Sequence, residues 1–264
     1  MSEGLDRWLR HSAMTDPGDQ AFLLDGRPAD LATLCRVIQG LLIHSDWLSA
    51  YDLPQPSPDT LSRETLPLAQ RLQRIFEADP QALTIPRVTG GRAVGTCRDF
   101  ALMLCGMLRH QRIPARVRCG FAAYFGANRW EDHWVCECWL PTEGRWRRVD
   151  AQIDAVLRQR LGIRFDTTDV PPDQFMTAGE AWHRCRAGAA DAAAFGHGAD
   201  HGLWFIRVNV VRDHFAVNQS EVSAWDSWRQ AVGKHQLVAP ADQETTDRLA
   251  QCPDAPLEIV TPAW

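Results

Sequence analysis

The sequence predicts an α+β fold in which a buried central helix precedes an antiparallel sheet. Apolar residues recur at helical spacing between positions 97 and 108, and β-like runs follow at 116–125, 133–140 and 146–153. The segment Pro-Thr-Glu-Gly at 141–144 separates the last two runs and predicts a hairpin. The chain before the central helix is also helical in its periodicity. Helices followed by a run of strands are typical of α+β domains.

The first third of the chain is expected to be helical. Apolar residues recur at helical spacing over 31–42, directly after Asp30, and over 68–76, directly after Pro67. The proline-rich segment 53–58 between them predicts a loop. These helices form the expected N-terminal lobe.

The central helix follows a glycine-punctuated loop at 89–95 and ends at Ile113-Pro114. Its apolar face is a single stripe at helical spacing: Cys97, Phe100, Ala101, Leu104, Cys105 and Leu108. We therefore expect this helix to be buried, with Cys105 as an ordinary core residue.

Beyond residue 155 the pattern is weaker. A helix is expected at 178–186, with loops or short turns at 170–173 and 188–202. Residues 202–209 predict either a strand or the start of a buried helix that runs towards His214.

We expect a single domain over residues 1–264, because the chain shows no internal repeat and no clear linker. Its parts would be a helical lobe at 1–84, a catalytic core at 85–155 and a C-terminal decoration at 156–264. A chain of this length can bury a core without covalent staples.

Charge and hydropathy exclude several classes of partner. The chain has 28 basic and 33 acidic residues, a net charge of -5, and no run of Lys or Arg that could follow a phosphate backbone. No stretch of 18 apolar residues occurs, and the N-terminus has no apolar signal-peptide segment. We expect a cytoplasmic protein that binds neither nucleic acid nor membrane.

The eight cysteines are expected to be free thiols, since a chain without an export signal is kept in a reducing compartment. Most should be small buried hydrophobic residues, with one or two reactive at most.

Cys97 is the candidate nucleophile. It lies where a glycine-bearing loop meets the first turn of the central helix, and unpaired backbone N–H groups and the helix dipole stabilise a thiolate there. Gly95 permits close backbone approach, and the N–H of Cys97 can serve as one donor of an oxyanion hole.

His133 and Asp150 are the candidate base and orienting carboxylate. His133 opens one strand of the predicted hairpin, and Asp150 lies near the end of the other. Hairpin pairing through the turn at 141–144 brings the two regions alongside one another, so that Asp150 can fix the tautomer of His133. Asp154 is a competing orienting carboxylate.

Four short motifs resemble the core of the transglutaminase-like superfamily, which has a cysteine-protease-like fold. They are Gly95-Thr-Cys97-Arg-Asp-Phe-Ala101, Ile113-Pro-Ala-Arg116 before a strand, Asp132-His133-Trp-Val and Arg148-Val-Asp150. The resemblance covers residues 85–155 and aligns Cys97 with the superfamily's nucleophile, His133 with its base and Asp150 with its orienting carboxylate. It implies acyl transfer at a carbonyl group through a thioester intermediate, without a cofactor or metal.

Two subgroups of that superfamily fit less well. Arylamine acetyltransferases place an aromatic and an acidic residue after the cysteine, whereas Arg98-Asp-Phe100 follows it here. No acidic cluster of the calcium-binding kind found in animal transglutaminases stands out. Small bacterial stand-alone members are the closer likeness.

Two possible metal sites are disfavoured by the local sequence pattern. His133 has the opposite strand parity to Cys136 and Cys138, so the three cannot share a zinc ion without a bulge. His197 and His201 lie among glycines, which favour a solvated loop over a ligand pair.

Other polar and aromatic residues have open roles. Thr96 is expected to cap the central helix or bond locally, and Trp134 to be a core residue. Arg98 and Asp99 either pair with other charges near the site or lie on a solvated surface. Polar and aromatic residues of the tail could build an acyl or amine pocket: Asn209, Arg212, Asp213, Trp225, Asp226 and Trp228.

The sequence thus predicts a thiol enzyme that transfers an acyl group from a small-molecule or peptide substrate. Water as the acceptor gives an amidase or peptidase, and an amine acceptor gives an amide-forming acyltransferase. The alternative is a non-catalytic module that binds a peptide or small ligand on the same fold.

Overall fold

The computed structural model describes residues 4–26, 30–55, 65–221 and 238–256. The chain divides into two compact units. The first contains residues 1–116 and 135–170, and the second contains residues 117–134 and 171–264. Strands β3 and β4 each run from one unit into the other.

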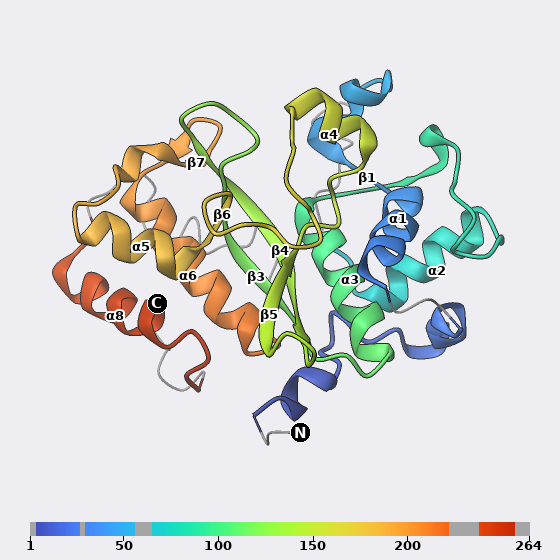
Figure 1. Cartoon of the computed structure of the whole chain (residues 1–264), viewed down its shortest axis with the longest axis horizontal. Coiled ribbons are helices and arrows are strands. Elements are labelled where there is room, and N and C mark those ends of the chain that lie inside the picture. The colour runs from blue at the N-terminus through green and yellow to red at the C-terminus, as the bar shows by residue number, and fades with distance from the viewer. Residues whose placement is uncertain (1–3, 27–29, 56–64, 222–237, 257–264) are drawn as a thin grey trace. The chain divides into compact units, whose positions relative to one another are not determined.

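Among the described residues of the first unit, the α-helices are α1 (Leu31–Leu41), α2 (Leu68–Ala78), α3 (Cys97–His110) and α4 (Ala155–Leu161). Short 3-10 helices lie at Asp6–Leu9, Gly18–Leu24, Ser45–Tyr51 and Thr89–Gly91. Asp30 begins α1 by accepting a hydrogen bond from the Thr33 N–H. Helices α1 and α2 both pack on α3 (Figure 1), which is buried along almost its whole length.

Two strand pairs belong to the first unit. Strands β1 (Leu42–His44) and β2 (Ala93–Gly95) are parallel, and β2 leads directly into α3. The C-terminal half of β4 (Trp130–Leu140) pairs antiparallel with β5 (Arg145–Val149) through the predicted turn. Their register sets Glu137 opposite Arg148.

In the part of the second unit that the structure describes, a sheet is combined with three α-helices. Its strands follow the order β6-β3-β4-β7-β8, with bounds β3 (Ala115–Ala122), β6 (Phe175–Thr177), β7 (Phe195–His197) and β8 (Asp200–His201). Its helices are α5 (Ala178–Arg186), α6 (Leu203–Val217) and α8 (Pro240–Gln251), with a 3-10 turn at Ala192–Ala194. The three α-helices pack on one another.

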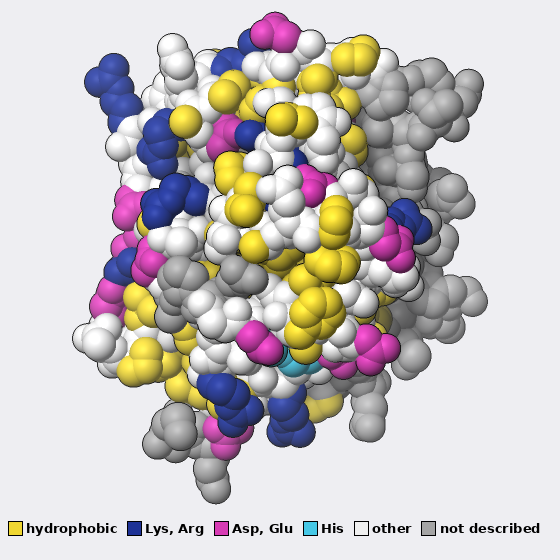
Figure 2. Space-filling model, turned by 90° about the vertical axis from the view of Figure 1, so that its right-hand side faces the viewer, with side chains coloured by type: hydrophobic (Ala, Val, Ile, Leu, Met, Phe, Trp, Pro, Cys, Tyr) yellow, Lys and Arg dark blue, Asp and Glu magenta, His cyan; other side chains and the backbone are white. Residues whose placement is uncertain are grey.

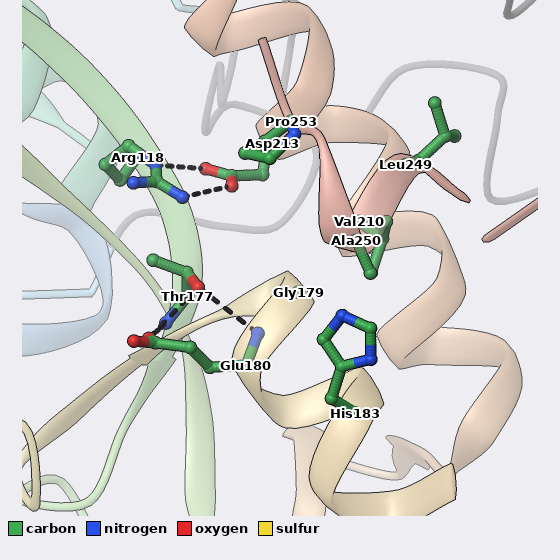
Figure 3. Close-up of a pocket in the computed structure, with 10 residues that line it drawn as sticks. All are labelled: Arg118, Thr177, Gly179, Glu180, His183, Val210, Asp213, Leu249, Ala250 and Pro253. Atoms are coloured by element: carbon green, nitrogen blue, oxygen red, sulfur yellow. Dashed lines mark hydrogen bonds and ion pairs between the residues drawn. The ribbon is translucent and has the colours of Figure 1, made fainter. Parts of the chain in front are cut away.

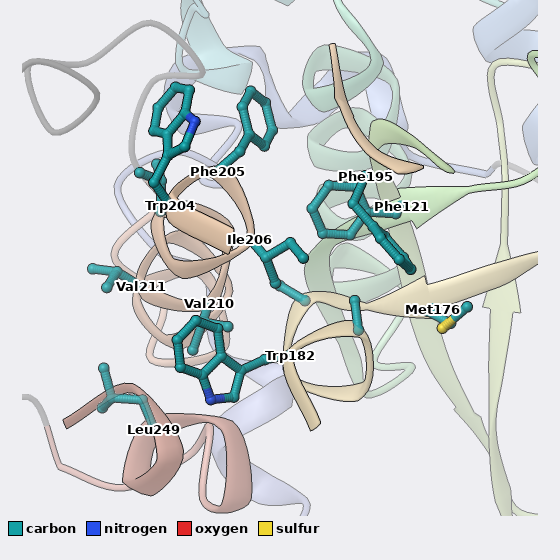
Figure 4. Close-up of a cluster of buried hydrophobic side chains, with 13 residues drawn as sticks. Phe121, Met176, Trp182, Phe195, Trp204, Phe205, Ile206, Val210, Val211 and Leu249 are labelled. Carbon is teal, nitrogen blue, oxygen red and sulfur yellow. The ribbon is translucent and has the colours of Figure 1, made fainter. Parts of the chain in front are cut away.

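A hydrophobic cluster joins α5 and α6 to one face of this sheet (Figure 4). Phe121 of β3 packs edge-on against Phe195 of β7, with 5.2 Å between ring centroids, and lies 6.2 Å from Phe205 of α6. Trp182 of α5 is fully buried in the same cluster. Burial of such aromatic side chains supplies most of the free energy that holds helices on a sheet.

The predicted α+β class is confirmed, and so are the helices expected at 31–42, 68–76, 97–108 and 178–186. The choice left open at 202–209 is decided in favour of a helix. It is α6, whose residues are buried on almost every side, so that its sequence lacks the polar face of a surface helix.

Three strand boundaries differ from the prediction. Strand β3 ends at Ala122 rather than at 125, β5 ends at Val149 rather than at 153, and β4 begins at Trp130, so that His133 lies inside the strand and does not open it. The second difference has a local cause, because an Asp150 carboxylate oxygen accepts a hydrogen bond from the Gln152 N–H, which turns the chain.

Within the described residues, no helix is both long and apolar enough to cross a membrane. On the face shown in Figure 2, basic and acidic side chains are interspersed around a band of apolar ones.

Candidate active site

Cys97 is the first residue of α3 and is partly exposed. The residues that follow it in the first turn, Arg98, Asp99 and Phe100, are buried. As the first helical residue, Cys97 has a backbone N–H without an intrahelical acceptor, and the positive end of the helix dipole lies at its side chain. Cys97 therefore lies at the N-terminus of the buried helix, as the sequence predicted.

Asp99 fixes the turn that carries Cys97. One of its carboxylate oxygens accepts hydrogen bonds from the Thr96 N–H at 2.7 Å and from the Thr96 hydroxyl at 3.1 Å. The other accepts from the Arg71 guanidinium of α2 at 2.7 Å. Arg71 also donates to the Val94 carbonyl at 2.9 Å. The carboxylate thus ties α2, β2 and α3 together next to Cys97.

Gly95 is required by the same carboxylate. A Cβ at this position would lie 3.0 Å from an Asp99 oxygen and 3.1 Å from its Cβ, closer than ordinary van der Waals contact. The glycine of the Gly-Thr-Cys motif therefore makes room for the buried acid that holds the turn.

Arg98 and Asp99 are both buried, which makes the solvated-surface alternative wrong. The other alternative is confirmed for Asp99, because it pairs with Arg71 within the first unit. Thr96 is the N-cap residue of α3, as expected.

Asp150 lies in the first unit, immediately after β5, and is 1% exposed. Its N–H donates to the Thr167 carbonyl at 2.8 Å. The Gln39 side-chain amide of α1 donates to the carbonyls of Ala151 and Ile153, which holds the following segment. The Asp150 backbone is therefore anchored on both sides.

His133 lies in the second unit on β4 and is 1% exposed. Three aromatic rings surround its imidazole. The centroid of Phe125 is 4.8 Å away, that of Tyr124 is 5.9 Å away and that of Phe175 is 6.5 Å away, all in edge-on arrangements. The imidazole thus packs against three aromatic side chains.

Strand alternation assigns these groups to faces of β4. His133 and Glu137 have the same parity and point to one face, whereas Asp132 and Trp134 point to the other. Cys136 and Cys138 share the parity of Trp134. The three candidate zinc ligands, His133, Cys136 and Cys138, therefore lie on opposite faces of the strand. No group of three or more potential metal ligands occurs within the described ranges.

Asp154 is engaged as the N-cap residue of α4. Its carboxylate accepts from the Leu157 N–H at 3.0 Å and pairs with Arg92 at 3.5 Å. Its role in the helix start explains the acid at this position without a catalytic task.

His197 and His201 lie on the short hairpin formed by β7 and β8 rather than on a helix. The His197 imidazole contacts a Glu131 carboxylate oxygen at 2.6 Å. The expected loop at 188–202 therefore contains a short strand pair, and the helix that a chelating histidine pair would need is absent at these residues.

Several other thiols are protected from reaction. Cys35, Cys105, Cys119, Cys136 and Cys138 are buried, as most were expected to be. Burial raises the pKa of Cys138 to about 12 and that of Cys185 to about 11. Burial also raises the pKa of Cys35 and Cys136, and the Asp150 carboxylate adds to the effect on Cys35.

A small cavity in the second unit lies among α5, α6, α8 and β3 (Figure 3). Ionisable side chains line it, including Glu180 and His183 of α5 and the ion pair between Arg118 and Asp213. Its lining contains no cysteine.

The polar and aromatic residues of the tail that could build an acyl or amine pocket differ in where they lie. Asn209, Arg212 and Asp213 lie on α6 and are buried. Asp213 accepts two hydrogen bonds from the Arg118 guanidinium, and Asn209 and Arg212 contact Asp132. Trp225, Asp226 and Trp228 lie outside the described residues.

Sequence reasoning missed the role of Arg71 and the aromatic residues around His133. Arg71 carried a signal, because it falls between Leu68 and Ile75 on the apolar face of α2, where a buried charge needs a partner. Tyr124 and Phe125 lie in the loop after β3 and carried none.

Comparisons with known proteins agree with the resemblance. Residues 78–151 match the transglutaminase-like superfamily, which confirms the predicted likeness over that region. The match indicates a thiol-dependent enzyme family. None of the curated proteins matches the chain.

A solved structure named "Putative Cysteine Protease", from Cytophaga hutchinsonii, is similar to part of the chain. The sequence identity is 17% and the TM-score is 0.38, over 58% of this chain and 43% of the other. The chain therefore spans less than half of the length of that protein.

Proposed function

We propose that this chain, which carries a transglutaminase-like core at residues 78–151, is an acyl-transfer enzyme with Cys97, His133 and Asp150 as its catalytic triad. Its substrate would be an amide, peptide or thioester. The observation that carries the proposal is the exposure of Cys97 at the start of α3, in a first turn that is otherwise buried and rigidly held.

In the first half of the reaction, the Cys97 thiolate attacks the substrate carbonyl carbon, and the carbonyl electrons move to the oxygen. The Cys97 N–H stabilises that oxyanion. The intermediate collapses, the bond to the leaving group breaks, and the leaving amine or thiol takes a proton from the imidazolium of His133. An acyl thioester on Cys97 remains.

In the second half, water or an amine attacks the thioester and gives its proton to the neutral His133. The Cys97 thiolate leaves, and an acid or an amide is released. Asp150 accepts a hydrogen bond from the imidazole and stabilises its protonated form.

The β4–β5 hairpin favours the proposed pairing of His133 with Asp150. Cys136 lies opposite Val149 in the last pair of the two strands, so His133 precedes that pair by three residues on β4 and Asp150 follows it by one residue after β5.

The rate of alkylation by iodoacetamide tests the triad. We expect Cys97 to react faster at pH 6–7 than Cys252, which is exposed and serves as an internal reference. Peptide mapping resolves the two sites. H133Q and D150N should each slow Cys97 while leaving Cys252 unchanged. If Cys97 reacts no faster than Cys252 in the parent protein, the alternative of a non-catalytic binding module is favoured.

Intact-mass spectrometry tests acyl transfer itself. After incubation with an acetyl ester or an acetyl thioester, the parent protein should gain one acetyl group that C97A does not. Addition of a small primary amine then separates the two outcomes, because an amide-forming enzyme yields the acetylated amine and a hydrolase yields acetate.

A further inference from the structure

Helix α6 holds both chain neighbours of His133. The Asn209 side-chain amide donates to one carboxylate oxygen of Asp132 at 2.9 Å, and Arg212 donates to the other at 3.3 Å. The Arg212 guanidinium carbon also lies 5.1 Å from the ring centroid of Trp134. One side chain of α6 thus contacts the residue before the imidazole and the residue after it.

The three polar groups form a closed network. Arg212 donates to the Asn209 amide oxygen at 2.7 Å, so that each of Asp132, Asn209 and Arg212 contacts the other two. Asn209 and Arg212 are three residues apart and share one face of α6. These contacts together hold the Asp132 carboxylate in place relative to α6.

Asn209 and Arg212 are fully buried in this network, and Asp132 is partly buried. The Arg212 side chain is 0% exposed and that of Asp132 is 12% exposed. A charge in such surroundings is strongly directed towards its partners, because the loss of a contact leaves a polar group unsolvated. The contact therefore resists small displacements of β4.

Helix α6 contacts the face of β4 that lies opposite the imidazole of His133. Asp132 and Trp134 point towards α6, whereas the aromatic rings of Tyr124, Phe125 and Phe175 contact His133 on the other face. Helix α6 therefore affects the position of the imidazole through the backbone of β4.

We propose that Arg212 is a positioning residue for His133, and that Asn209 supports it by binding both Arg212 and Asp132. The proposal rests on the proposed function, in which His133 exchanges protons with Cys97 and with the substrate. By anchoring β4 on both sides of His133, Arg212 fixes the depth and rotation of the imidazole. Catalytic groups depend on such placement, since a displacement of about 1 Å lowers rates by about 100-fold.

The Arg212 guanidinium makes several contacts at once. Its Nη1 atom donates to both Asp132 and Asn209, and its central carbon lies over the Trp134 ring, 5.1 Å from the centroid. Lysine keeps a charge beside Asp132 but lacks the planar group that contacts the ring.

Three variants test the proposal by Cys97 alkylation with iodoacetamide. We expect R212M to slow the reaction by about 10–100-fold, and R212K to restore part of the rate. N209A, which keeps the ion pair, should slow it by about threefold to tenfold and serves as the readout if R212M does not fold.

D213N is the matched control. It changes another buried anchor of α6, which binds Arg118 and the Cys119 N–H of β3 rather than the neighbours of His133. We expect D213N to lose stability but to keep the alkylation rate of Cys97 within about twofold of the parent. A folded R212M with the parental rate, or an equal loss in D213N, would overturn the proposal.

Nuclear magnetic resonance of His133 separates this proposal from the proposed function. Ring currents from Phe125 and Tyr124 should displace the imidazole proton signals from random-coil values in the parent protein. R212M should move these signals towards random-coil values, and D213N should not. This readout holds even if Cys97 in the parent is no more reactive than Cys252, a result that would refute only the proposed function.

Discussion

The buried pair of Asp99 and Arg71 predicts a large effect for the substitution D99N. The ion pair is 2.7 Å long, with side chains 2% and 8% exposed respectively. Asparagine keeps an oxygen that can accept from the Thr96 N–H, so the helix cap survives. Arg71, however, becomes a buried charge beside a neutral amide. Loss of one partner from such a pair costs about 3–5 kcal/mol, and we expect D99N to fall near 3 kcal/mol.

The matched comparison is D169N. Asp169 also pairs with an arginine, Arg145, but their side chains are 33% and 48% exposed. Exposed pairs contribute about 0–1 kcal/mol, so D169N should change the free energy of unfolding by no more than that. The double variant R71M/D99N should recover part of the loss, because no buried charge remains unpaired.

Urea unfolding followed by tryptophan fluorescence measures these differences, provided that the unfolding slope is the same in all variants. Iodoacetamide labelling of Cys97 on the same samples reports on the first turn of α3. If D99N and D169N destabilise the protein equally, the assignment of Asp99 as the anchor of the turn that carries Cys97 is incorrect.

Three further outcomes are expected. G120A should destabilise the protein by more than about 2 kcal/mol in urea unfolding, because a Cβ there meets the Met176 carbonyl and, at 2.8 Å, the Phe175 ring. Burial lowers the pKa of His214 below its ordinary value of 6.5, so stability should fall as the pH drops below 6.5, and less steeply in H214N. Cys138, with a pKa of about 12, should resist alkylation in the native protein at pH 8 and react once urea unfolds it.

Local signals predicted most of the fold. Asp30 before an apolar stripe predicted the start of α1, and its carboxylate does accept from the Thr33 N–H. The turn at 141–144 predicted the β4–β5 hairpin in the observed strand order. Each of these depends on residues close in sequence, where propensity and spacing decide the outcome.

The buried charges of the site could not be predicted in the same way. Asp99 finds its partner 28 residues away, and Arg212 finds Asp132 across 80 residues. From sequence, a charged residue in an apolar segment indicates only that some partner is needed. The identity of that partner depends on which elements pack together, and this is a property of the whole fold.

The anchoring of β3 and β4 by α6 limits how far the protein can be shortened. A fragment trimmed to the matched region, residues 78–151, would lack α6 entirely. Arg118 and Asp132 would then lose Asp213 and Arg212, their counterions, and Phe121 would lose its cover. A minimal expression fragment must therefore extend at least through Val217, well beyond the stretch that sequence similarity alone would select.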